Sequence, residues 1–258
     1  MTQYRYIEVE SDQDRAYITM NRPEKRNALS LSHMEELISA FTWVASSELA
    51  GVVLRANGPV FSAGHDFADM AGQDLTYMRN LLRTCTELMT LISEIPQVVV
   101  AQVHALATAA GAQLVASCDL AVAASTAGFA APGGKGGWFC HTPMVAIAHS
   151  IGRKRAAEMA LTGDVISAET AVQWGLINYS VEPELLVSAT EDLLTRATRG
   201  SRYSKGFGKE VLYKQIDLPI KQSYQLAVEA MASASQTEDA REGMAAFLEK
   251  RSPKWQHR

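Results

Sequence analysis

The sequence predicts an α/β protein with a largely parallel sheet and a C-terminal helical layer. In the first half of the chain, apolar β-rich runs alternate with helical patterns in the order strand, helix, strand, helix, strand, helix. That alternation implies right-handed crossovers and therefore parallel strand pairing. From about residue 144 onward, helical spacing of apolar residues dominates. The chain of 258 residues is 47% hydrophobic, which is enough for one large core.

The first elements have clear local signals. Two short β-rich runs, residues 4–9 and 16–20, are joined by polar residues at 11–14 and predict a hairpin. Ser30 is a good N-cap, so we expect a helix from about Leu31. The buried face of that helix is expected to carry Leu37, Ile38 and Phe41.

The alternation continues through the middle of the chain. A buried-strand pattern at 51–56 ends in the turn signal Asn57-Gly-Pro, and helical spacing covers residues 74–94. Pro96 separates that helix from the β-branched run at 98–103. We expect later strands at 120–123 and 176–181, and helices at 144–150, 153–161, 168–174, 184–197, 205–213, 218–234 and 239–249.

Composition excludes several classes of protein. A net charge of −4 argues against a general nucleic-acid binder, because binding to phosphate backbones needs a basic face. Three cysteines without C-x-x-C spacing predict neither a disulfide framework nor a metal site. No signal-peptide pattern opens the chain, and charged or polar residues interrupt the one stretch near membrane length, 98–124. We therefore expect no membrane partner and a cytoplasmic location.

The stretch from Val103 to Ala123 carries the functional hypothesis. It passes through small residues at 107–112 and then predicts a short helix that ends near Asp119. Small side chains let another group approach the backbone, and a helix N-terminus offers unpaired N–H groups. These features suit an oxyanion hole, although a buried, tightly packed helix is the open alternative.

Two glycine-containing loops add to this pattern. Residues 60–67 form a second small-residue loop after a strand, where a ligand-binding backbone is expected. Five glycines fall within residues 128–143, which argues against a stable helix or central strand there. We expect this segment to be a flexible lid or a pocket wall.

Six short motifs occur in order along nearly the whole chain: Asn21-Arg-Pro with Asn27-Ala-Leu, Phe61-Ser-Ala-Gly-His-Asp, Gly111-Ala-Gln-Leu with Cys118-Asp, Leu161-Thr-Gly, Ala168…Ala171…Trp174-Gly-Leu, and Glu242-Gly-Met-Ala-Ala-Phe-Leu-Glu-Lys-Arg. Together they resemble the enoyl-CoA hydratase/isomerase (crotonase) superfamily. The resemblance implies the crotonase (ClpP-like) fold, with a spiral of ββα units in residues 1–195 and a C-terminal helical trimerisation region in residues 196–258. It also implies a homotrimer or hexamer and an acyl-CoA substrate; because coenzyme A belongs to that substrate, no cofactor is expected.

The resemblance assigns roles by position. The backbone N–H groups of His65 and Ala110 would point at the thioester oxygen, and fixed donors of this kind stabilise an enolate. At the other matched positions the resemblance implies contacts with coenzyme A. The alternatives there are solvated charged side chains and an ordinary core phenylalanine. Those positions are Lys25, Arg26, Ala28, Ala63, Asp66, Phe247 and Lys250.

Two departures from the family pattern bear on the reaction. Typical hydratases of this family carry glutamates at the positions of Gln113 and Gly133. Hydration needs a base and an acid with pKa values near the working pH, and neither an amide nor a glycine supplies them. His141 is one substitute, since histidine titrates near pH 6.5, and the side chain of His65 is another. Structural roles for both histidines are the alternatives, and Phe139 and Met144 are expected as acyl-pocket walls.

Three functions therefore remain open at the level of sequence. The first is a hydratase/isomerase-type enzyme with an oxyanion hole and a substituted acid or base. The second is a decarboxylase of a malonyl-type CoA, because loss of CO₂ needs an oxyanion hole but no strong base. The third is a protein that binds acyl-CoA without turnover.

Overall fold

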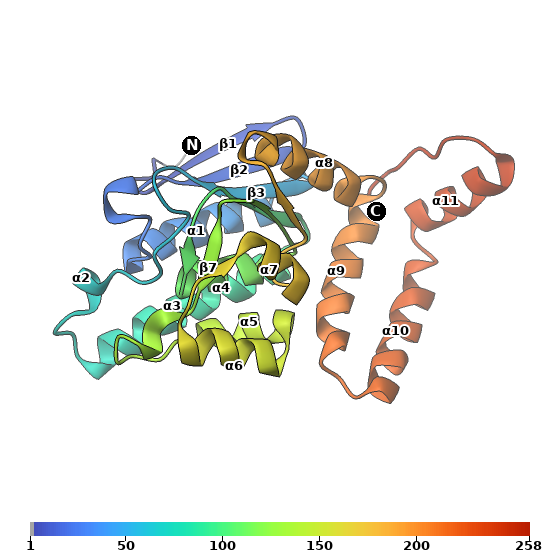
Figure 1. The fold of residues 1–258 in the computed structure, drawn as a ribbon. Helices are drawn as coiled ribbons and strands as arrows, with labels where there is room; N and C mark the ends of the chain where they lie inside the picture. Colours follow the sequence, from blue (N-terminus) through green and yellow to red (C-terminus); the bar gives the residue numbers. More distant parts are fainter. Residues whose placement is uncertain (1–2) are drawn as a thin grey trace.

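The computed structural model describes residues 3–258, which form a main body and a group of helices extending from it (Figure 1). The body is centred on a six-stranded sheet in the order β1-β2-β3-β4-β6-β9. The β1–β2 hairpin is antiparallel and every other neighbouring pair is parallel, which confirms the predicted arrangement. The strands are β1 (Ile7–Asp12), β2 (Arg15–Met20), β3 (Gly51–Ala56), β4 (Val98–Val103), β6 (Leu120–Ala124) and β9 (Tyr179–Val181).

A second sheet of three short strands lies beside the first and was not expected from the sequence. It contains β5 (Ala107–Thr108), β7 (Gly128–Ala130) and β8 (Ile166–Ser167), in the order β5-β7-β8. Strands of two or three residues are too short to show an alternating pattern, so their partners alone reveal them. The prediction that the glycine-rich segment contains no central strand is therefore wrong at its start, because β7 is the middle strand of this sheet. A short 3-10 helix, Pro132–Gly134, follows it.

Most helices begin and end close to the predicted residues. They are α1 (Leu31–Ala45), α2 (Phe67–Met70), α3 (Leu75–Glu94), α4 (Ala110–Ser117), α5 (Pro143–Ile151), α6 (Arg153–Thr162), α7 (Ala168–Trp174), α8 (Leu186–Thr198), α9 (Arg202–Ile216), α10 (Ile220–Ala234) and α11 (Glu238–Glu249). The Ser30 hydroxyl accepts a hydrogen bond from His33 N at 3.3 Å, as expected of an N-cap. Helix α9 starts three residues earlier than predicted, because Ser201 caps it through Ser204 N at 3.0 Å.

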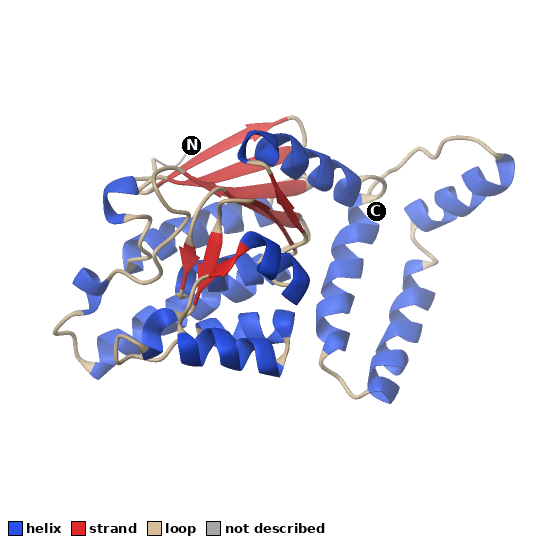
Figure 2. Cartoon of the chain, in the orientation of Figure 1, coloured by secondary structure: helices blue, strands red, loops and turns tan. Residues whose placement is uncertain are grey.

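Helices lie on both sides of the strands in Figure 2, and both faces of the main sheet are buried. In β3, Val52 and Leu54 belong to the larger core, together with residues of α1 and α3. Val53 points the other way, into a smaller core with Leu194 of α8. Burial of both faces explains why this strand is a continuous apolar run rather than an alternating one.

Helices α9, α10 and α11 extend from the body (Figure 1), and a buried ion pair fixes the first of them. Lys209 Nζ lies 2.8 Å from Asp119 Oδ2, and the two side chains are only 8% and 11% exposed. Lys209 also donates to the Ile92 and Gln97 carbonyl oxygens at 3.0 and 2.9 Å. Asp119 in turn accepts from Val99 N at 2.7 Å and from the Tyr213 hydroxyl at 2.7 Å.

No helix in the part of the chain that the structure describes is both long and apolar enough to cross a bilayer.

Replacing one member of the buried pair should destabilise the fold. In Lys209→Met the carboxylate of Asp119 stays buried without its counter-ion, and breaking such a pair costs about 3–5 kcal/mol. We expect a loss of that size in the free energy of unfolding measured by urea titration. Lys205→Met is the matched control, since Lys205 is exposed one turn earlier on α9 and should change stability by less than about 0.5 kcal/mol. Equal losses in the two variants would contradict the assignment.

Candidate active site

A cavity of about 300 Å³ opens where three segments meet. They are the loop before α2, the start of α4 and the glycine-rich segment after β7. Its walls are mainly apolar and include Ala63, Leu82, Ala109, Pro132 and Phe139. The titratable residues that line it are His65, Cys140 and His141, and no carboxylate of residues 3–258 does so.

The backbone N–H groups of residues 62–66 are almost all hydrogen-bonded. Ala63 N donates to Arg26 O at 3.0 Å, Gly64 N to Ser62 Oγ at 3.3 Å, and Asp66 N to Leu29 O at 3.2 Å. Within residues 3–258, the N–H of His65 has no such partner. Because backbone donors are nearly always paired, an unpaired one beside a cavity is available to a ligand.

The start of α4 also has an N–H group without an acceptor. Thr108 N donates to Ser62 O at 2.9 Å and Ala109 N to Ala130 O at 2.8 Å, whereas the described chain offers Ala110 N no acceptor. Ala110 is the first residue of the helix, so its free N–H is an expected consequence of helix geometry. The cavity therefore lies beside two segments that each have one unpaired amide.

Close backbone contact brings these two segments together. A Cβ placed on Gly64 would lie 3.2 Å from Ala110 N, and one on Gly111 would lie 2.5 Å from Ser62 O. Glycine is needed at both positions, because a side chain on either would push the loop away from the helix. Ala109 between them has φ 50° and ψ −118°, a conformation that strains an L residue. Such strain is typical of functional sites.

The His65 ring is buried and lines the cavity. It is 9% exposed, and neither ring nitrogen has a hydrogen-bond partner among the described residues. Burial lowers the pKa of His65 below its usual value near 6.5, which keeps the imidazole neutral at pH 7. The Trp138 ring lies beside it, with ring centroids 6.4 Å apart.

Gln113 and Gly133 occupy different environments. The buried Gln113 side chain is directed at α3, where its Oε1 lies 3.9 Å from Cys85 Sγ, and the residue is not part of the cavity wall. Gly133 does line the cavity. A Cβ there would overlap the Trp138 carbonyl oxygen and lie 2.7 Å from Cys140 Sγ. The loop of residues 133–140 has therefore folded into the space that a side chain at position 133 would need.

His141 lies at the exposed rim of the cavity. Its ring packs against Phe139, with centroids 5.0 Å apart, and its backbone N–H donates to Phe139 O at 2.9 Å. Phe139 lines the cavity as the sequence predicts, whereas Met144 packs against the core and is not part of the cavity wall.

The loop that carries Lys25, Arg26 and Ala28 is held by a buried asparagine. Asn27 Nδ2 donates to Asn57 O at 2.7 Å and to Val60 O at 3.1 Å, and its Oδ1 accepts from Arg22 N at 2.8 Å. Lys25 and Arg26 are exposed and Ala28 is buried. The loop thus places two cations near the rim without using them internally.

Asp66 and Ala63 lie on the adjoining loop. The Asp66 carboxylate pairs with Arg22 Nη1 at 2.8 Å, caps α2 through Ala68 N at 3.0 Å and is only 8% exposed. Its charge therefore ties the two loops together. Ala63 lines the cavity directly.

Phe247 and Lys250 lie far along the chain, at the end of α11, away from the body in Figure 1. Phe247 is 83% exposed, so within one chain it is neither a core residue nor part of the cavity.

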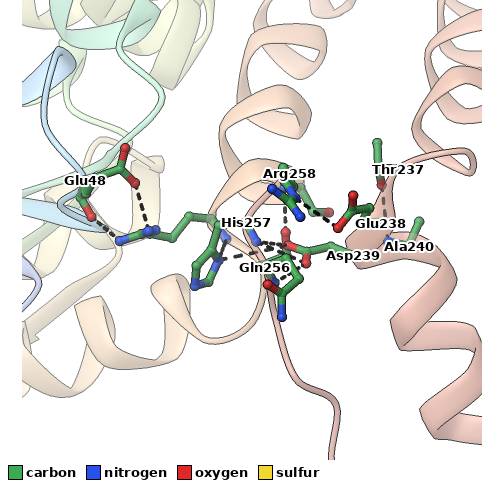
Figure 3. A network of polar contacts seen from close by, with 11 residues as sticks. Glu48, Thr237, Glu238, Asp239, Ala240, Gln256, His257 and Arg258 are labelled. Atoms are coloured by element: carbon green, nitrogen blue, oxygen red, sulfur yellow. Dashed lines mark hydrogen bonds and ion pairs between the residues drawn. The ribbon is translucent and has the colours of Figure 1, made fainter.

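The start of α11 is held by polar contacts with the C-terminal segment (Figure 3). Asp239 accepts from Gln256 N at 2.6 Å and from His257 N at 2.9 Å. The Arg202 guanidinium bonds to Glu48 of the body and its backbone N–H donates to His257 Nδ1.

The comparison with protein families decides the assignment. A model described as enoyl-CoA hydratase/isomerase matches residues 10–258. The chain belongs to the enoyl-CoA hydratase/isomerase family. It is 42% identical to the rat protein named enoyl-CoA hydratase domain-containing protein 3, mitochondrial, over 93% of this chain and 81% of that protein.

Solved structures of this hydratase/isomerase family share the fold. An enoyl-CoA hydratase of Mycobacterium smegmatis superposes with a TM-score of 0.95 at 40% identity, covering 98% of this chain and 99% of that one. Human enoyl-CoA hydratase domain-containing protein 3 superposes with a TM-score of 0.94 at 39% identity, covering 97% and 100%. These matches confirm the predicted crotonase fold and the resemblance on which it was based.

The comparison contradicts the expected cytoplasmic location. Five family members that are 39–42% identical, from rat, mouse, zebrafish, human and Xenopus, are named as mitochondrial. They point to a mitochondrial location instead. The expectation relied on the absence of a signal-peptide pattern and on free cysteines, and neither distinguishes between reducing compartments.

Several cavity residues of this family member had no assigned role in the sequence analysis. Cys140 and Trp138 adjoin His141 in sequence, but only the folded loop shows that they line the cavity. Leu82 comes from α3, next to the buried Leu81, and its side chain reaches the cavity wall. No metal-binding cluster of His, Cys, Asp and Glu occurs among residues 3–258.

The tight packing at Gly133 can be tested by adding a single methyl group. In Gly133→Ala the Cβ would overlap the backbone of Trp138, so we expect a loss of about 1–3 kcal/mol in the free energy of unfolding. Gly136→Ala is the matched control in the same loop, because its Cβ would meet only Gly133 O at 3.6 Å. A fully stable Gly133→Ala variant would show that the loop has room for a side chain at this position.

Proposed function

We propose that this protein binds an acyl-CoA thioester and stabilises the enolate formed from it. The proposal is carried by the unpaired amides of His65 and Ala110 on segments that meet at one cavity. A thioester oxygen gains charge as an enolate forms, and two fixed N–H donors stabilise that charge. Loss of one such donor typically costs about 10²–10³-fold in rate.

Hydration by a pair of glutamates is not part of the proposal. The cavity has no carboxylate from the described residues, Gln113 faces Cys85, and the loop fills the space beside Gly133. We assign the role of the base that activates water to His141, which is exposed at the rim of the cavity. The reaction class is therefore that of a hydratase or isomerase with a substituted proton-transfer group.

Decarboxylation of a malonyl-type CoA is the second candidate, and the uncharged cavity wall favours it. Departure of CO₂ leaves the electron pair on the thioester, so the reaction needs the two amides but no base. An apolar wall also destabilises a substrate carboxylate relative to neutral CO₂.

Coenzyme A contacts are proposed for both loops beside the cavity. Lys25, Arg26 and Ala28 would lie along the coenzyme A, the first two with exposed positive charge for its phosphate groups, while Ala63 and Asp66 would border its adenine end. In this proposal Phe247 and Lys250 serve a neighbouring subunit, because they lie away from the cavity of their own chain.

Two assays of the purified protein distinguish these candidates. We expect crotonyl-CoA absorbance to fall through hydration, and His141→Ala to lower that rate by about 10²-fold or more. Release of CO₂ from methylmalonyl-CoA without crotonyl-CoA turnover would instead favour decarboxylation. Tight binding of butyryl-CoA by calorimetry with neither reaction would indicate a binding protein, and absence of binding would contradict the proposed site altogether.

We further propose a homotrimer or hexamer formed through the C-terminal helices. Helix α10 carries an apolar stripe of Ile220, Tyr224, Val228 and Met231, which are 60–80% exposed in one chain. Exposure of a stripe this long is unusual for a soluble monomer and indicates an interface.

A charge placed in this stripe should prevent assembly. We expect light scattering to report a trimer or hexamer for the unmodified protein and a monomer for Val228→Lys. Glu229→Lys on the neighbouring position is a control for added charge and should remain assembled. A monomeric unmodified protein would contradict the proposal.

A further inference from the structure

The three titratable residues that line the cavity differ in their ability to donate a proton to a bound ligand. His65 is neutral at pH 7 because burial lowers its pKa, and a neutral imidazole is a poor acid. His141 lies at the exposed rim. Cys140 is 7% exposed, and its thiol is a buried group on the cavity wall that can donate a proton.

The local sequence explains how Cys140 reaches the cavity wall. Gly133 has no side chain, and the Cys140 thiol occupies the space next to it, 2.7 Å from where a Cβ would lie. Burial raises the pKa of this thiol, and the Gly133 backbone offsets the effect only in part. The thiol therefore keeps its proton at neutral pH.

A second observation indicates that this part of the cavity holds a polar ligand atom. The His65 ring lines the same cavity and is nine-tenths buried, yet both of its nitrogens lack partners in the described chain. A buried polar group without a hydrogen-bond partner is destabilising, and a ligand oxygen or nitrogen bound to it would remove that cost.

We propose that the Cys140 thiol is the proton donor to the α-carbon of the enolate in this cavity. The inference rests on the proposed function, since it needs an enolate held by the His65 and Ala110 amides. It applies to both candidate reactions, because each ends with protonation of the same carbon.

The step balances without a further reactant. The enolate forms either by addition of water to the β-carbon or by loss of CO₂. The sulfur–hydrogen bond of Cys140 then breaks as a carbon–hydrogen bond forms at the α-carbon. The negative charge leaves the thioester oxygen and appears on sulfur, and the thiolate regains a proton from water. In the reverse direction the thiolate removes an α-proton, so exchange of that proton with solvent reports the step directly.

The test follows deuterium incorporation into the α-position of butyryl-CoA in D₂O by mass spectrometry. We expect exchange in the unmodified protein to accelerate as the pH rises toward the raised pKa of the thiol. Cys140→Ala should reduce exchange by about 10²-fold or more. Cys140→Asp should retain exchange with a flat profile above neutral pH, a change that a purely structural role of Cys140 would not produce.

Binding and cysteine controls separate the possible failures. Cys118→Ala removes a buried thiol that is not part of the cavity wall and should leave exchange unchanged. Butyryl-CoA binding by calorimetry is measured for every variant. Absence of binding to the unmodified protein would overturn the proposed function. Normal binding with no exchange, or with exchange equal in Cys140→Ala, would overturn the role of Cys140 alone.

Discussion

The site depends on one backbone arrangement, in which residues 62–66 are hydrogen-bonded on both sides. On one side they bond to residues 26–29, and on the other to residues 106–108. These contacts fix the loop so firmly that the N–H of His65 remains unpaired beside the cavity. Side chains contribute mainly by holding this backbone arrangement, as the Asn27 amide does through three main-chain atoms at positions 22, 57 and 60.

This backbone arrangement also explains the strained conformation of Ala109 and the need for glycine at positions 64 and 111. Ala109 keeps an unfavourable conformation because its N–H is bound by Ala130 O and its carbonyl accepts from Gln113 N. Gly64 and Gly111 let the loop and helix α4 touch. The hydrogen bonds on both sides of Ala109 enforce this conformation, which sets the direction of the Ala110 amide before any ligand arrives.

Much of the fold could be predicted from the sequence, because long elements carry periodic signals. The boundaries of β3 and α7 agree residue for residue with the predicted ones. The three short strands of the second sheet carry no such signal, since their partners are 22 to 39 residues away. Packing against α1 and α4 decides which side of α3 turns inward, and it leaves Leu75 63% exposed while Cys85 is buried.

The candidate site could be predicted only where main-chain atoms define it. Motif order placed His65 and Ala110 on segments that the structure brings together. Side-chain placement was harder: Gln113 turns toward Cys85, and the fold of residues 133–140 beside Gly133 depends on contacts that no local pattern encodes.

The attachment of α9 to the body affects how the molecule opens. A few polar links, chiefly Lys209 with Asp119, join α9–α11 to the body, so this part should open as a separate cooperative unit while the sheet stays protected from hydrogen exchange.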